Sequence, residues 1–81
     1  MAQRGGTVVA QVKRIAEIDR EYRARIAEKE VMLASRKAAA DAEGDAERAG
    51  KLREEHARDV ARLRETMERE KDKVRKRSSR G

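Results

Sequence analysis

The 81-residue chain lacks several residue types that ordinary globular domains contain. It has no cysteine, proline, tryptophan or phenylalanine, and its only aromatic residue is Tyr22. The absence of cysteine excludes disulfides and thiolate metal sites. Large apolar residues are sparse and 47 % of the residues are charged, which excludes a conventional globular core and leaves a coiled coil or disorder. No apolar run approaches the ~18 residues that a membrane-spanning helix needs.

Charge is abundant but unevenly distributed around a net value of +6. Residues 1–40 hold nine basic and five acidic residues, residues 41–50 hold one and four, and residues 51–81 hold twelve and seven. The last nine residues, KVRKRSSRG, contain five basic residues and no acidic one: Lys73, Arg75, Lys76, Arg77 and Arg80. Such an end favours an anionic partner such as nucleic acid, an acidic protein or a lipid surface. The alternative is a solubilising terminus.

Apolar residues recur at helical spacing in both halves of the chain, a periodicity that a disordered chain lacks. In the first half a heptad frame has Val12, Asp19, Ile26 and Leu33 at position a, and Val8, Ile15, Tyr22 and Lys29 at position d. In the second half a similar frame passes through His56, Val60, Leu63, Met67 and Val74. The two frames differ by one residue, a slip that a continuous coiled coil does not absorb easily. The chain is therefore expected to bend or turn between Leu33 and Ala49.

The stretch AAADAEGDAERAG, residues 38–50, predicts the position of that turn. Gly44 suits the left-handed residue that follows a helix, and Asp45 suits the N-cap of the next helix. We therefore expect an all-α fold, an antiparallel helical hairpin. Its expected parts are a flexible lead over residues 1–7, a helix over 8–43, a turn at 44–45, a helix over 46–77 and a basic tail over 78–81.

The alternative architecture is one near-continuous helix of about 70 residues in which the central glycines are merely tolerated at ~1 kcal/mol each. Two features favour this rod. In the hairpin, Asp41 and Glu43 lie at the negative end of the first helix, where carboxylates are unfavourable. The expected register also places Asp19 opposite Glu70, a like-charge layer.

Nine side chains form the predicted helix–helix seam, namely Val12, Ile15, Tyr22, Ile26, Leu33, Val60, Leu63, Met67 and Val74. Three further apolar residues, Ile18, Met32 and Leu52, fall outside it and are predicted to form a second contact surface. A second surface of this kind favours self-association into a four-helix bundle or docking on a larger assembly.

The sequence contains no constellation of residues that indicates catalysis. There is one histidine, no cysteine and no glycine-rich phosphate loop, so no catalytic site, metal site or cofactor is expected. We expect a non-catalytic structural or adaptor coiled-coil subunit that makes protein–protein contacts within an oligomer or larger complex. The expected location is intracellular and cytoplasmic, with an organelle as the alternative. A second hypothesis is a small basic nucleic-acid-associated protein.

A third hypothesis comes from two stretches, REYRAR at residues 20–25 and DVARLRETMEREKDKVRKR at residues 59–77. Together they cover about a third of the chain and resemble the mitochondrial ATPase inhibitor proteins, which are short basic helical chains. The histidine cluster of that family is absent here, and the two blocks lie further apart. The resemblance implies a helical inhibitor that inserts into a groove of a partner enzyme.

Overall fold

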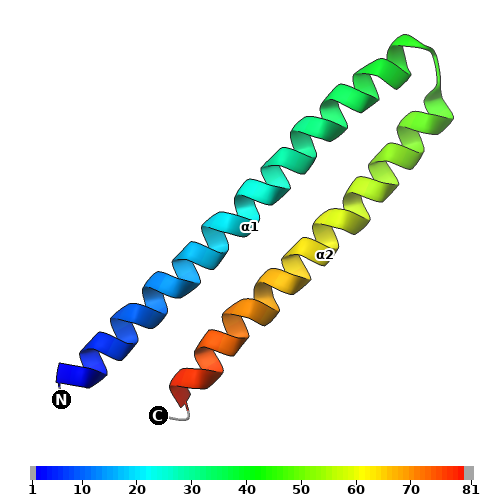
Figure 1. The fold of residues 1–81 in the computed structure, drawn as a ribbon. Helices are drawn as coiled ribbons and strands as arrows, with labels where there is room; N and C mark the ends of the chain where they lie inside the picture. Colours follow the sequence, from blue (N-terminus) through cyan, green and yellow to red (C-terminus); the bar gives the residue numbers. More distant parts are fainter. Residues whose placement is uncertain (1, 80–81) are drawn as a thin grey trace.

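The computed structural model describes residues 2–79, which form two helices, α1 (Ala2–Ala42) and α2 (Ala46–Ser79). The helices run antiparallel, so the start of α1 and the end of α2 lie side by side at the open end of the molecule (Figure 1). The body is 64 Å long and 16 Å wide. The predicted hairpin is therefore confirmed, and the single continuous helix is excluded.

The turn is built by two residues that each perform a capping function. Gly44 has a φ of +72°, a left-handed conformation that only glycine adopts without a steric cost. Its amide donates to the carbonyl of Asp41 at 3.0 Å, and the amide of Asp45 donates to the carbonyl of Ala40 at 2.9 Å. These two bonds form a Schellman motif. The Asp45 carboxylate then accepts a bond from the Arg48 amide at 3.0 Å, which caps α2.

The first residues of the chain differ from the expected lead. The helix α1 begins at Ala2 and includes Gly5 and Gly6, so residues 2–7 are helical where the sequence predicted a flexible segment. Glycine lowers helix stability by only ~1 kcal/mol per residue, and extending an existing helix is far easier than nucleating one. At the other end α2 continues to Ser79, two residues past the expected boundary.

The residues that face the partner helix follow an 11-residue repeat rather than a heptad. The steps between them are three, four and four residues. On α1 the buried and half-buried members are Gln11, Ile15, Ile18, Tyr22, Ile26, Leu33, Lys37 and Ala40, and the position between Ile26 and Leu33 is taken by Lys29, which is exposed. On α2 they are Ala49, Leu52, His56, Val60, Leu63, Met67, Lys71 and Val74. Eleven residues in three turns make about 3.67 residues per turn, close to the 3.6 of a straight helix. The two helices therefore keep one face together with little supercoiling.

This repeat corrects two of the predicted residue positions. Ile18, predicted to lie on a second contact surface, is only 1 % exposed and is the largest fully buried side chain. Val12, predicted to lie in the seam, is 61 % exposed. A heptad frame places Val12, three residues before Ile15, in the seam. In the structure the seam instead runs through Gln11, which is half-buried, Ile15 and Ile18. The other eight predicted seam residues are buried or half-buried.

Polar contacts between the helices fix their register near the open end. The Lys71 ammonium, on a residue that is 9 % exposed, donates to an Asp19 carboxylate oxygen at 2.6 Å. This bond lowers the pKa of the Asp19 carboxyl, against the opposing effect of burial and with further help from Arg23 at 2.7 Å. The side-chain amide of Gln11 also donates to the Val74 carbonyl at 2.6 Å.

These contacts compensate the unfavourable charges that the sequence predicts for the hairpin and that favoured a single continuous helix. Asp19 is paired with Lys71, so its neighbour across the seam is a cation rather than the carboxylate of Glu70. At the turn, Arg48 lies 3.4 Å from the Glu43 carboxylate and compensates one of the two acids at the negative end of α1.

Candidate interaction surface

The outer faces of the two helices, which point away from the seam, differ sharply in chemistry. On α1 this face carries small and apolar side chains at alternating steps of three and four residues, and all are exposed: Ala24, Ala27, Val31, Ala34 and Ala38. We call these five residues the α1 outer stripe. Val31, at its centre, is 70 % exposed and is the most exposed large apolar side chain among those described. An amphipathic helix of a stable isolated hairpin has polar residues at such positions.

The α1 outer stripe has the shape of a surface on which another helix can pack. Ala24, Ala27, Glu28 and Val31, together with Met32, line a shallow, open and mostly apolar hollow. The first four are spaced at i, i+3, i+4 and i+7, which is the set of residues that forms one hole in knobs-into-holes packing. Because two of the four are alanines, the floor of the hollow lies close to the α1 backbone. A side chain from another helix fits there, and two helix axes can approach closely.

The outer face of α2 is charged along its whole length. Its exposed residues there are Glu47, Lys51, Glu54, Arg58, Ala61, Arg62, Glu65, Arg69, Asp72 and Lys76. Several of them pair within the helix, for example Arg69 with Glu65 at 2.8 Å and Lys51 with Glu47 at 3.8 Å. Such exposed pairs contribute only a few tenths of a kcal/mol each, and they describe a face that is solvated by water. The hairpin therefore has a charged outer face on α2 and an apolar stretch on the outer face of α1 over residues 24–38.

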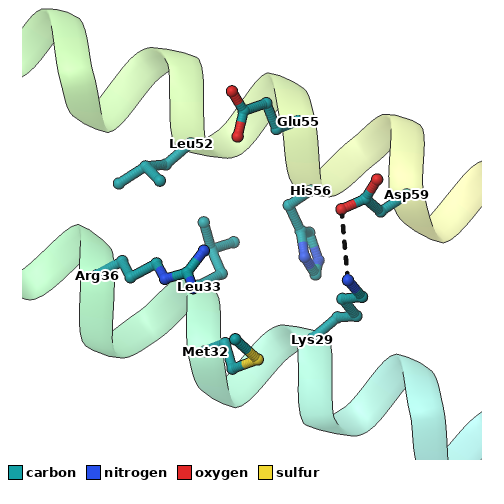
Figure 2. Close-up of a pocket in the computed structure, with 8 residues that line it drawn as sticks. All are labelled: Lys29, Met32, Leu33, Arg36, Leu52, Glu55, His56 and Asp59. Atoms are coloured by element: carbon teal, nitrogen blue, oxygen red, sulfur yellow. Dashed lines mark ion pairs between the residues drawn. The ribbon is translucent and has the colours of Figure 1, made fainter.

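A groove along one edge of the seam holds the two remaining residues of the predicted second contact surface. Figure 2 shows Leu33, Leu52 and His56 pointing into the space between the helices, with Met32 beside them. An ion pair between Lys29 and Asp59, at 3.6 Å, closes one end of the groove.

Met32 is 46 % exposed and lines both this groove and the hollow of the outer stripe. Met32 and Leu52 thus lie together, as their sequence positions suggested, whereas Ile18 belongs to the core. The groove edge and the outer stripe meet at Met32, and we call the two together the α1 flank.

The predicted anionic-partner contact lies at the end of α2. Two of its basic residues are already engaged within the helix: Lys73 lies 3.4 Å from Glu70, and Arg75 lies 2.9 Å from Asp72. Lys76 and Arg77 occupy the last turn of α2, where cations stabilise a helix through its dipole. Arg80 lies outside the described residues. The local role of this basic segment is therefore at least in part to stabilise the end of α2.

Within residues 2–79, no three side chains of the metal-ligating types come together, and neither helix has a stretch long and apolar enough to cross a membrane. The single aromatic residue, Tyr22, is half-buried and has the Arg25 guanidinium 4.8 Å from its ring centroid. It is therefore a packing residue at the seam edge.

The sequence pattern did contain the signal for the α1 outer stripe. Its five members follow a three–four spacing over 15 residues. Four of them are alanine, however, whereas the heptad frames rest on large apolar residues. Val31 fell outside those frames. Alanine stripes become informative once the seam is known, because only then is it clear that they face away from it.

No protein-family model, no curated protein and no solved structure matches this chain.

Proposed function

We propose that the protein is a non-catalytic structural or adaptor subunit that uses the α1 flank to bind another protein within a larger assembly. The observation that carries the proposal is the difference between the two outer faces. The α1 outer stripe exposes an apolar, knob-accepting surface, whereas the equivalent face of α2 is covered by charge. Burial of apolar surface is the main driving force of protein association.

The composition of the core supports the same proposal. Among the described residues the buried apolar side chains are Ile18, Ile26, Ala40 and Ala49, of which two are alanines. A chain of this size with so narrow a core gains little from its own folding, and small folds commonly obtain additional stability from a partner. A protein bound on the α1 flank would bury the stripe and supply that stability.

The proposal can be tested by photo-crosslinking in the cells that express the protein natively. A photoreactive residue replaces Ala34 in the stripe, and in a matched control it replaces Ala61, an exposed alanine on the outer face of α2. We expect discrete crosslinked protein products from position 34 and none from position 61. Equal crosslinking at both positions would contradict the proposal. Crosslinks to nucleic acid from a third probe at Arg77 would instead support the basic-protein hypothesis.

A further inference from the structure

We propose that the partner on the α1 outer stripe is a second copy of this chain, packed antiparallel about a two-fold axis to form a layer of four helices. This inference depends on the proposed function, because it names the partner of the same surface. In this layer the helices lie in the order α2–α1–α1–α2, because the outer stripe points away from the seam, so the two charged α2 helices are on the outside. Two-fold dimers, in which the same surface patch of both copies is self-complementary, are the commonest soluble homo-oligomers.

The charges that bound the stripe indicate the antiparallel direction. Continuing its three–four spacing leads to Arg20 at one end and to Asp41 at the other, and both residues are exposed. A parallel pair would set Arg20 against Arg20 and Asp41 against Asp41, and like charges at an interface are costly. An antiparallel pair brings the basic end of each stripe to the acidic end of the other.

A cation near Asp41 would also offset the unfavourable interaction of its carboxylate with the helix dipole. Asp41 lies in the last turn of α1, which contains no basic residue, and the helix dipole disfavours a carboxylate there. Glu43, two residues later, is compensated by Arg48 across the turn. The antiparallel dimer supplies Arg20 of the second copy to the region of Asp41.

The residues that flank the stripe select one register. In the stripe Ala24, Val31 and Ala38 are at heptad position a, and Ala27 and Ala34 are at position d. In an antiparallel pair the a residues of one helix face the d residues of the other, so the possible registers differ by shifts of seven residues. One register sets Glu30 against Glu30 of the second copy and Arg23 against Lys37. The other sets Val31 beside Ala34 and sets Glu30 beside Lys37, twice by symmetry. Lys37 is half-buried and lies on α1 between the seam and the stripe, so it borders both surfaces. Flanking charges decide partner choice and orientation in coiled coils, so the second register is favoured.

The register can be tested by charge exchange in the full chain. Glu30 and Lys37 lie seven residues apart on α1, roughly 10 Å at the helical rise, so they do not pair with each other within one copy. The single variant Glu30→Lys sets a second cation against Lys37 at two points and is expected to weaken dimerisation roughly ten-fold or more. The double variant Glu30→Lys/Lys37→Glu is expected to restore it. Failure of the exchange to restore association would overturn this register.

The surface and the direction can be tested on the same protein. In sedimentation equilibrium we expect a dimer for the natural chain and for Ala61→Lys, and a shift to monomer for Ala34→Lys. For direction, a spin label on the single cysteine of Glu17→Cys is useful, because the natural chain has no cysteine. The label-to-label distance is about 45 Å in the antiparallel dimer and about 10 Å in a parallel one.

Each outcome separates this inference from the proposed function. A natural chain that stays monomeric at all concentrations would overturn the dimer, whereas crosslinking of a different protein from position 34 would still support the proposed function. A dimer that tolerates Ala34→Lys as well as Ala61→Lys would place the interface elsewhere and overturn the inference. A label distance near 10 Å, the value expected for a parallel pair, would overturn the antiparallel direction.

Discussion

Replacing Ile18 by alanine is the most direct test of how the two helices meet. Ile18 is 1 % exposed and is the largest fully buried side chain. Truncation of a buried isoleucine to alanine costs about 2–5 kcal/mol, with smaller values where neighbours can close the cavity. A two-helix seam is open along both edges, so neighbours can relax, and alanine regains roughly 0.4 kcal/mol of helix propensity. We therefore expect a loss of about 2–3 kcal/mol in the free energy of unfolding.

The matched control is Val12→Ala, six residues earlier on the same helix. Val12 is 61 % exposed, and surface substitutions usually change stability by no more than about 0.5 kcal/mol. Urea unfolding followed by far-ultraviolet circular dichroism measures both variants, at one fixed protein concentration because association would shift the apparent stability. In thermal unfolding the Ile18 variant should lose on the order of 10–20 °C. Equal losses for the two variants, or a larger loss for Val12→Ala, would refute the 11-residue seam and favour the heptad frame.

Two further predictions concern the turn and the Asp19–Lys71 ion pair. Gly44→Ala should destabilise the hairpin by about 1–2 kcal/mol, because the φ of +72° is strained for any side chain. The control Gly50→Ala should stabilise it by about 0.5–1 kcal/mol, since Gly50 lies within α2 with open space around its Cα. Both are read by urea unfolding, and similar effects of the two substitutions would contradict the role of Gly44. The pKa of the Asp19 carboxyl is lowered chiefly by its hydrogen bond to Lys71, so the stability from this pair is fully present above the unfolded pKa of about 3.9 and is lost as the pH falls through the lower folded pKa. A pH titration of the melting temperature should therefore show a steeper acid decline for the natural chain than for Asp19→Asn, and parallel curves would contradict the pairing.

The sequence by itself determined that the chain forms two helices and where the turn between them lies. A periodic apolar pattern without proline specifies helices through interactions that reach only three or four residues along the chain. The turn is equally local. Gly44 supplies a left-handed backbone and Asp45 supplies an acceptor for the first free amides of α2. Because these effects need no partner helix, they could be read from neighbouring residues.

The tertiary structure alone decided which residues lie in the seam. The spacings from Ile15 to Val12 and from Ile15 to Ile18 are both three residues, so a single helix presents either pair equally well. Only the presence of α2 buries Ile18 and leaves Val12 in solvent. The heptad frame assumed a left-handed supercoil, whereas two nearly straight helices keep contact through an 11-residue repeat. The pairing of Asp19 with Lys71 follows from the same geometry, because residues 52 positions apart meet only when the hairpin closes.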